Sequence, residues 1–566
     1  MHQLISRRAL AIAAVAVALG TAGTAASAVQ PVSAPLLPRA AAGTPRGTTA
    51  SPSATPSARP GASTAQHVAA ATASPHVVPP AALPCDSEAP APGGDWPSYG
   101  HDPSNSRTQT AETALPPARA SALAPAWTFA LSSVGDAGQL ESTPVVVNGC
   151  AFVAATNGGV YALDAATGKL IWRQVLSVAT PGLGGGIVGG AAVGHGRVYA
   201  LINETGNGVV GPHLVALDQH GGRVVWTSKP ITTGSGYYTN ATPQLIGDVV
   251  FAGFSPPEGD PTGQGGFALV DAEDGSIVKV TPTITPQHQQ QGFAGGGIWS
   301  TPAWDPRTGF AYVGAGNPYS KDREDEHVNA ILKIDMREES SSFGDIVAAY
   351  KGNVDQYTTT LQALAHTPLC AATTSAPDPL DNPACGQLDL DFGAAPNLFT
   401  VNGRTVVGEL QKSGVYHVAD AGSMQPVWNT IVGATCQACN AASTAVDGTS
   451  VIGESTPGGL LYSLQQNGGA RNWISPVGDG VHYQAISVAD GVAYTFDTLG
   501  CFDAWDTASG TPLLRRPMAA DVQFPTAALT SGGVAIAYHT VFVAASTEAS
   551  SAGAPQNGYV VAYRAG

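Results

Sequence analysis

Charged residues are scarce in this sequence of 566 residues, and positive charge is the scarcest. Asp, Glu, Lys and Arg together make up 12% of the chain, and 25 basic residues stand against 41 acidic ones. Nucleic acid is bound through clustered basic side chains, so this balance argues against such a partner. Two catalytic signatures are also missing, because no Gly-x-Ser-x-Gly elbow and no His-Glu-x-x-His zinc motif occurs. The hydrolase mechanisms that those motifs serve are therefore not indicated.

Long hydrophobic runs are missing too. The longest apolar stretch, from Ala9 to Gly20, is too short to cross a bilayer as a helix. It follows Arg7 and Arg8 and precedes the A-x-A site Ala26-Ser27-Ala28, which is the pattern of an export signal over residues 1–28. We therefore expect a secreted chain with no transmembrane segment in its mature form. The paired arginines leave both the general secretory and the twin-arginine route open.

Residues 29–94 contain few large apolar side chains and consist mostly of Ala, Pro, Ser and Thr. Such a segment cannot bury enough surface to offset its ordering entropy, so it is expected to be a disordered linker. A passive tether is the simpler interpretation, and a cell-wall spacer is the alternative. Residues 95–566 are then expected to form the folded part. The whole chain has 68 glycines and abundant Val, Ala and Thr, and this composition favours strands and tight turns over helices.

One unit recurs along residues 95–566: an apolar strand ending in Asp, a turn containing Gly, and a strand that often ends in Trp. In its eight copies the first strand contains the following residues: Ala162-Leu163-Asp164, Ala216-Leu217-Asp218, Leu269-Val270-Asp271, Lys333-Ile334-Asp335, Val418-Ala419-Asp420, Ser463-Leu464-Gln465, Ala504-Trp505-Asp506 and Tyr559-Val560-Val561. The Asp is expected to cap the turn and the Trp to pack between units, so neither is given a catalytic role.

Each unit also has two earlier strands, such as 142–147 and 150–154, which are joined by the Asn148-Gly149 hairpin turn. Three such strands and the strand after the turn make a four-stranded antiparallel blade. The eighth unit stops before its last strand, and the segment Pro125–Phe129 can supply it. The sequence therefore predicts an all-β, eight-bladed β-propeller closed by an N-terminal strand, which leaves no long exposed edge.

The unit Ala162–Trp172, which reads Ala-x-Asp-x-x-Thr-Gly-x-x-x-Trp, resembles the repeat of quinoprotein propellers that bind pyrroloquinoline quinone (PQQ). Three further stretches are similar to polyvinyl-alcohol dehydrogenases and related quinoprotein alcohol dehydrogenases. They are Gly297–Pro302 with Gly314–Ser320, then Asp389-Leu390-Asp391-Phe392-Gly393, then Lys412-Ser413-Gly414. The repeat alone is shared with non-enzymatic propellers, so these stretches carry the more specific part of the resemblance.

The resemblance implies a cofactor site of PQQ over a calcium ion. Trp299 would stack on the flat quinone, Lys412 would hydrogen-bond a quinone oxygen, and Glu141 would contact the cofactor's edge. Calcium takes oxygen ligands, for which the resemblance offers the Glu258 carboxylate and the Asn317 amide. The ion would polarise the quinone carbonyl as a Lewis acid.

Asp355 is the candidate general base that would remove the alcohol proton. Many alcohol-oxidising quinoproteins have an acidic residue three positions further on, where this chain has Thr358, so either Asp355 serves or the base is missing. The other site residues have plainer alternatives. Trp299 can be a packing aromatic, Asn317 a turn former before Pro318, and Glu258 and Lys412 ordinary loop residues.

The seven cysteines of an exported chain suggest up to three disulfides. We expect a local pair at Cys436 and Cys439, a second pair at Cys370 and Cys385, and an odd thiol at Cys85 in the linker. No Cys-x-x-Cys-His motif is present, so no c-type haem is attached and electrons would leave to a separate acceptor.

The functional hypothesis is an extracellular PQQ- and calcium-dependent dehydrogenase that oxidises a secondary or polymeric alcohol. The alternative from another class is a non-catalytic propeller that serves as a scaffold for protein or polysaccharide binding at the cell surface. A catalytic site predicts that the candidate residues converge at the mouth of the central channel, whereas a scaffold predicts that they scatter.

Overall fold

Strand follows strand through the described chain, and the few helices are short. The structure is a computed structural model that describes residues 85–86, 92–176, 189–203, 211–320, 324–353, 370–371, 390–435, 440–456, 459–476, 484–522, 533–547 and 557–566. All of them belong to one unit, Ala82–Gly566. The expected export signal, Asp355 with Thr358, and Cys385, Cys436 and Cys439 lie outside the described residues.

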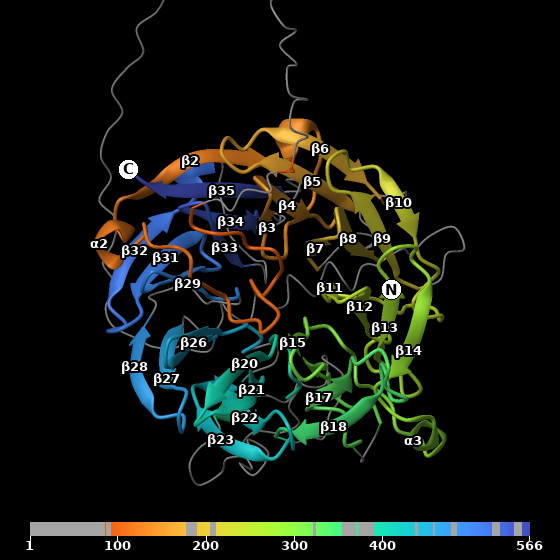
Figure 1. Ribbon diagram of the computed structural model, residues 1–566. Coiled ribbons are helices and arrows are strands. Elements are labelled where there is room, and N and C mark those ends of the chain that lie inside the picture. Colours follow the sequence, from red (N-terminus) through yellow and green to blue (C-terminus); the bar gives the residue numbers. More distant parts are fainter. Residues whose placement is uncertain are drawn as a thin grey trace, which may run out of the picture. The chain divides into compact units, whose positions relative to one another are not determined.

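The strands form eight blades of four antiparallel strands arranged around a ring, here called blades 1 to 8, and the sheet of blade 7 gains a fifth strand at its inner edge (Figure 1). The first strands of the blades, at the centre, are β3 (Val145–Val147), β7 (Ala191–Gly194), β11 (Gln244–Ile246), β15 (Ala303–Asp305), β20 (Asn397–Val401), β25 (Ala445–Asp447), β29 (Ser487–Ala489) and β33 (Val534–Ala537). The second strands are β4 (Cys150–Ala154), β8 (Arg197–Ile202), β12 (Val249–Phe254), β16 (Phe310–Gly314), β21 (Arg404–Leu410), β26 (Ser450–Ser455), β30 (Val492–Phe496) and β34 (Thr540–Ser546).

The third strands are β5 (Gly159–Asp164), β9 (His213–Asp218), β13 (Gly266–Asp271), β17 (Ala330–Asp335), β22 (Val415–Asp420), β27 (Leu460–Gln465), β31 (Cys501–Asp506) and β35 (Gly558–Ala565). The outermost strands are β6 (Leu170–Val175), β10 (Val224–Thr227), β14 (Ile277–Pro282), β18 (Ile346–Lys351), β23 (Pro426–Ile431), β28 (Arg471–Pro476), β32 (Pro512–Pro517) and, in blade 8, β2 (Leu123–Ala130). A small separate sheet pairs β19 (Cys370–Ala371) with β24 (Ala434–Thr435).

Blade 8 is completed from the N-terminal side, as the sequence predicts. Strand β2 pairs antiparallel with β35, from Leu123 opposite Ala565 to Ala130 opposite Tyr559. In this way the ring closes with a continuous hydrogen-bonded sheet across its seam, which removes an open edge at that point.

The repeat residues have the structural roles expected of them. Asp164 accepts hydrogen bonds from the Thr167 amide at 2.8 Å and the Thr167 hydroxyl at 2.7 Å, which caps the turn of blade 1. Trp172 then reaches into blade 2, where its indole nitrogen donates to the Gln219 carbonyl at 2.9 Å. A Cβ on Gly222 would lie 2.4 Å from Cε3 of Trp172, so the turn needs glycine both for this contact and for its φ of +68°.

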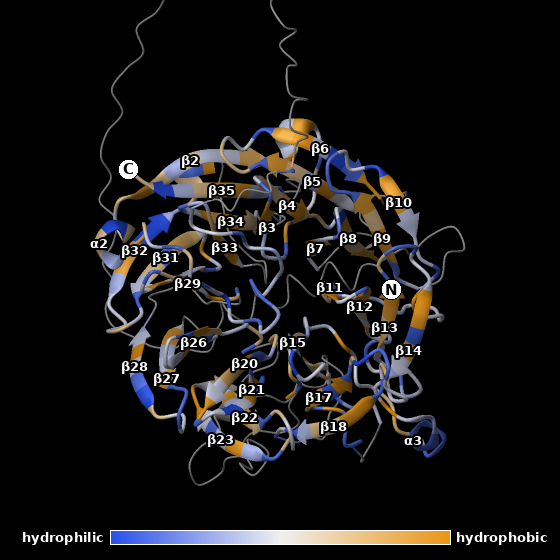
Figure 2. Ribbon diagram, in the orientation of Figure 1, coloured by the Kyte–Doolittle hydropathy of each residue, from blue (hydrophilic) through white to orange (hydrophobic). Residues whose placement is uncertain are grey.

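The core lies between neighbouring blades, where the second and third strands are buried along nearly their whole length. The outermost strands alternate between half-buried and exposed positions, as in β10 and β14. Figure 2 shows this difference as a mixture of hydrophilic and hydrophobic residues on the outermost strands. Period-two alternation is the pattern of a strand with one face against a core and the other in water.

A segment that has no copy elsewhere in the chain crosses the inside of the ring (orange in Figure 1). This crossing segment, Trp96–Gln109, ends in β1 (Thr108–Gln109), which runs parallel to β29. Its backbone also bonds Val146, Trp304, Leu398 and Val446, which lie on the first strands of blades 1, 4, 5 and 6. One stretch of chain therefore ties together the inner strands of five blades.

The helical elements among the described residues are α2 (Pro117–Ala120), α3 (Pro286–Gln290), α5 (Ala519–Val522) and the 3-10 helix η1 (Leu131–Val134). In the described part of the chain, no helix has the length and apolar character needed to span a membrane.

One prediction from the cysteines is wrong. Cys85 is not an odd thiol, because it forms a disulfide with Cys150 at the start of β4. The linker end is thus fixed to blade 1, and Gln219 of blade 2 adds a hydrogen bond to the Cys85 carbonyl at 2.9 Å. Cys501 in blade 7 is a free cysteine.

Candidate functional site

The sequence-predicted site residues lie at one edge of the blades. In an antiparallel blade the first strand begins where the second strand ends, so residues before a first strand and after a second strand share an edge. Glu141 and Trp299 precede the first strands β3 and β15, whereas Glu258, Asn317 and Lys412 follow the second strands β12, β16 and β21. The described candidates therefore belong to one face of the ring, here called the candidate face.

Two of these residues meet around the carboxylate of Asp391, which is not one of the predicted site residues. The Trp299 indole nitrogen donates to Oδ2 of Asp391 at 3.1 Å, and Nζ of Lys412 lies 2.5 Å from Oδ1 of the same residue. Nζ of Lys412 is also 5.1 Å from the centre of the Trp299 ring. Blades 4 and 5 thus join a flat aromatic surface, a cation and an anion.

This arrangement is sheltered from water. Asp391 is 2% exposed and Lys412 is 7% exposed. The Trp299 ring packs on Gly393, where a Cβ would lie 1.9 Å from Cη2, so only glycine permits this ring position. The motif Asp391-Phe392-Gly393 therefore supplies both the ring's hydrogen-bond acceptor and the space for the ring. Its presence in the sequence was the only signal of this role.

The loops that carry Glu258, Trp299 and Asn317 lie side by side. The Ile298 amide donates to the Phe254 carbonyl at 3.0 Å, and the Gly296 amide donates to the Asn317 carbonyl at 2.9 Å. Loops from blades 3 and 4 are thus held together directly beside Trp299.

The side chains of the two expected metal ligands differ in their surroundings. Asn317 is 7% exposed, whereas Glu258 is half-buried at the end of its loop. Within the described ranges, no three His, Cys, Asp or Glu residues form a cluster that could hold a metal ion. One carboxylate and one amide are also fewer ligands than the six to eight oxygens that calcium takes, so further oxygens would have to come from elsewhere.

Glu141 occupies the position in blade 1 that Trp299 occupies in blade 4, since each precedes a Ser-Thr-Pro sequence. Glu141 is half-buried, and burial raises the pKa of its carboxyl to about 7. A carboxyl with this pKa titrates near neutral pH, unlike an ordinary surface glutamate.

The crossing segment lies directly beneath this face. Nη2 of Arg107 donates to the Thr143 hydroxyl at 3.2 Å, and Nδ2 of Asn105 donates to the Thr301 carbonyl at 3.1 Å. Thr143 and Thr301 each follow a candidate residue by two positions, so the crossing segment supports Glu141 and Trp299 from below. Arg107 itself is fully buried. No motif or repeat in the sequence indicated this support.

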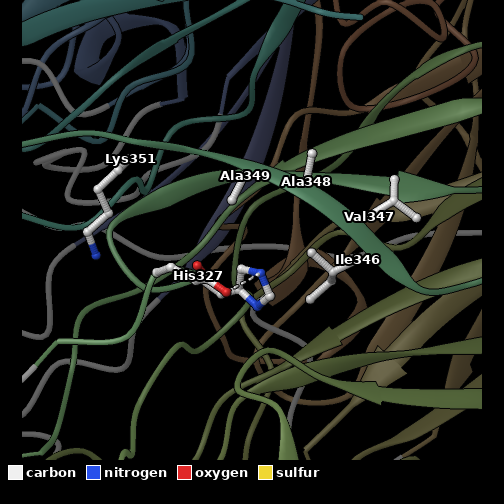
Figure 3. A pocket seen from close by; sticks show the side chains of 7 residues that line it. His327, Ile346, Val347, Ala348, Ala349 and Lys351 are labelled. Carbon is white, nitrogen blue, oxygen red and sulfur yellow. Dashed lines mark ion pairs between the residues drawn. The ribbon is translucent and has the colours of Figure 1, made fainter. Parts of the chain in front are cut away.

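One pocket lies beside the outermost strand of blade 4, away from the candidate residues (Figure 3). It has a volume of about 410 Å³ and is lined by Glu326, His327, Ile346, Val347, Ala348, Ala349 and Lys351. Nδ1 of His327 bonds the Thr283 carbonyl at 2.9 Å, and Nζ of Lys351 pairs with Glu324 at 2.8 Å. No candidate residue lines it, so this pocket does not bear on the candidate face.

Comparisons with known proteins agree with the motifs. The profile of a family described as "Outer membrane protein assembly factor BamB" matches residues 120–349. The dehydrogenase subunit of a quinone alcohol dehydrogenase from Gluconobacter oxydans is 28% identical over 260 residues, which are 40% of this chain and 32% of that protein. A quinohemoprotein alcohol dehydrogenase from Pseudomonas putida is 26% identical over 257 residues, or 41% of this chain and 35% of that protein. The chain thus spans about a third of these curated relatives.

Solved structures show the fold over a longer stretch. The quinohemoprotein alcohol dehydrogenase of Comamonas testosteroni superposes with a TM-score of 0.60 at 16% identity, covering 83% of this chain and 80% of that one. A europium-containing methanol dehydrogenase gives a TM-score of 0.60 at 14% identity, over 84% of this chain and 99% of that one. The chain is therefore an eight-bladed propeller similar in sequence and in fold to the quinoprotein alcohol dehydrogenases, as its repeats and motifs predicted.

Proposed function

We propose that the protein is a PQQ-dependent alcohol dehydrogenase. The observation that carries the proposal is the contact of Trp299 and Lys412 with the buried Asp391 on the candidate face. A quinone that bears carboxylates needs a flat surface to stack on and a cation to meet its oxygens, and these residues provide both. The similarity to quinoprotein alcohol dehydrogenases supports the same reading.

The residues of this chain fit such a group. Trp299 would support the ring, Gly393 keeps Trp299 in place, and Asp391 holds the Lys412 ammonium where it can donate to a ring oxygen. When bound, PQQ supplies the two-electron acceptor that an alcohol dehydrogenase requires. Glu141, with its raised pKa, would meet the cofactor's edge as a neutral acid below about pH 7.

We further propose that calcium binds with the quinone, through the Glu258 carboxylate and the Asn317 amide oxygen. The neighbouring loops of these two residues support this arrangement. Asp355 is proposed to take the proton of the alcohol hydroxyl, with a secondary or polymeric alcohol as substrate and a separate electron acceptor. We also propose that residues 1–28 direct the export of the chain.

A titration of the purified mature chain with PQQ tests the proposal. Calorimetric heat is measured with and without calcium, for the wild type, Glu258→Gln, Asn317→Ala and the control Glu273→Gln, whose side chain is exposed on the turn of blade 3. We expect calcium-dependent binding that weakens at least tenfold in the first two variants and is unchanged in the control. Reduction of a dye by secondary alcohols is then followed in the loaded protein. Absence of binding by the wild type would overturn the proposal and favour a scaffold propeller.

A further inference from the structure

A second buried carboxyl stands beside the ion pair of the candidate face. Glu409 lies on β21, three residues before Lys412, and is fully buried. Neither of its carboxyl oxygens has a hydrogen-bond partner among the described residues. A Cβ on Gly314 of blade 4 would lie 2.3 Å from Oε1, so the carboxyl is pressed against the backbone of the neighbouring blade.

The surroundings of Glu409 offer it little compensating charge. The titratable groups around it are Tyr312, Tyr350, Asp391, Lys412, Tyr416 and His417, whereas Arg404 and Asp420 lie at the other ends of β21 and β22. His417 is opposite Glu409 on β22, and burial lowers its pKa to about 3, so it is neutral. Burial raises the pKa of Tyr350 to about 12, so this phenol is neutral as well. The remaining cation, Lys412, is already paired with Asp391 at 2.5 Å.

Two buried carboxylates cannot share one ammonium without a large cost. Removing an anion from water is expensive unless it is paired and hydrogen-bonded, and a like charge nearby adds to that cost. Burial, and then the charge of Asp391, raise the pKa of Glu409 well above its ordinary value. Asp391 has hydrogen bonds and a cation to stabilise its charge, so the proton resides on Glu409.

We propose that Glu409 is protonated in the wall of the candidate quinone site. Because Glu409 then carries no charge, Asp391 is the anion that pairs with Lys412 and accepts the hydrogen bond of Trp299. Glu409 is thus a positioning residue, and the proposal rests on the function proposed above. An ionised Glu409 would compete with Asp391 for the ammonium and draw Lys412 away from the ring face where the quinone is expected.

Blade 6 contains a matched control. Glu454 follows a glycine on β26 as Glu409 follows Gly408 on β21, is 1% exposed, and has no hydrogen-bond partner for either carboxyl oxygen among the described residues. Burial raises its pKa as well, but its charged neighbours are Asp503, Arg107 and Asp497. Neither Asp391 nor Lys412 is among these charged neighbours, so Glu454→Gln removes an equally buried acid that does not act on the Asp391–Lys412 ion pair.

The first measurement needs no cofactor. Infrared spectra of the purified chain should contain the carbonyl band of a protonated carboxyl, and Glu409→Gln should remove its share of that band. Because the folded state keeps this proton while the unfolded state loses it above the ordinary pKa of 4.5, wild-type stability falls as pH rises. The unfolding constant of the wild type should thus rise relative to Glu409→Gln by up to tenfold per pH unit above that value. An unchanged infrared band, or parallel pH profiles of unfolding, would overturn the proposal.

The second measurement separates a site role from simple burial. PQQ binding is titrated by calorimetry between pH 6 and pH 9 for the wild type, Glu409→Gln and Glu454→Gln. At pH 7 we expect all three proteins to bind within threefold of one another. Toward pH 9 the wild type and Glu454→Gln should weaken relative to Glu409→Gln, because only the latter cannot ionise beside Asp391. A more than tenfold loss in folded Glu409→Gln at pH 7 would mean that an anion is needed there, and would overturn the proposal.

The two proposals fail in different ways. If the wild type binds no PQQ, the proposed function fails, and the infrared band and the unfolding profiles still decide whether Glu409 holds a proton.

Discussion

Lys412 and Asp391 form a buried ion pair on the candidate face, with Nζ 2.5 Å from Oδ1. The second oxygen of Asp391 accepts from Trp299, so one carboxylate fixes both the cation and the edge of the aromatic ring. A buried pair of this kind contributes little net stability over an apolar pair, because both charges lose their hydration. Its value lies in geometry, since it holds two groups of different chemistry in one place.

Asp391→Asn should be strongly destabilising. The substitution leaves Lys412 buried without its counter-charge, which costs about 3–5 kcal/mol of unfolding free energy. The control is Asp345→Asn, since Asp345 pairs with Lys279 at 2.7 Å with both side chains partly exposed, and such a pair is worth about 0–1 kcal/mol. Chemical denaturation of both variants measures the difference. Equal losses would show that burial of the Asp391 pair has no energetic consequence.

Glu141→Gln should flatten the pH dependence of stability between pH 5 and pH 7. The folded-state pKa of Glu141 is raised to about 7 from 4.5, so the folded chain holds a proton that the unfolded chain releases. Wild-type stability contributed by this proton is therefore present below pH 4.5 and is lost as the pH rises toward 7. Thermal unfolding midpoints of wild type and variant, measured across this range, should converge at low pH and separate at pH 7. A constant gap would contradict the raised pKa.

Gly222→Ala should be more harmful than Gly196→Ala. Both glycines have a φ near +70°, so both alanines carry the strain of the left-handed region, about 1–2 kcal/mol. A Cβ at Gly196 would meet nothing within 4 Å, whereas at Gly222 it would lie 2.4 Å from the Trp172 ring. Overpacking should add about 1–3 kcal/mol to the second loss. Urea unfolding of the two variants measures how much the contact with Trp172 adds to the loss of unfolding free energy. Similar losses in the two variants would contradict the prediction.

Replacing Cys85 and Cys150 together by serine should lower stability by up to about 4 kcal/mol, because the disulfide closes a long loop in the unfolded chain. The control is Cys501→Ser, which removes the described free thiol. Peptide mapping without reduction checks the Cys85–Cys150 link, and a free Cys85 would refute it.

Burial raises the pKa of Cys501 to about 11, so its thiol should react slowly with alkylating reagents at pH 8.

The architecture could be predicted because its signals are local. The turn from Asp164 to Gly168 and the strand that ends in Trp172 lie within one short stretch of sequence, and the pattern recurs in later blades. Each copy carries its own strand, turn and packing residue. Counting the copies gave eight blades, and the missing last strand pointed to the segment that became β2.

The details of the candidate face depend on contacts between residues far apart in the chain. Motifs in the sequence contain Trp299, Lys412 and Asp391, yet they do not show that the Asp391 carboxylate lies between the other two side chains, because no periodicity relates position 391 to position 299. Cys85 was misassigned for the same reason, since its partner is 65 residues away in blade 1. The crossing segment was missed because its residues bond to inner strands of five blades and repeat nothing.

The pairing of β2 with β35 has a consequence for the order in which the protein is made. A ribosome synthesises β2 before any blade and β35 after all the others, so β2 must wait without its partner throughout synthesis. During that time the unpaired backbone groups of β2 can form hydrogen bonds with a strand of another chain. A chain cut short before Gly558 would have blades 1 to 7, but β2 would have no partner and the ring would not close.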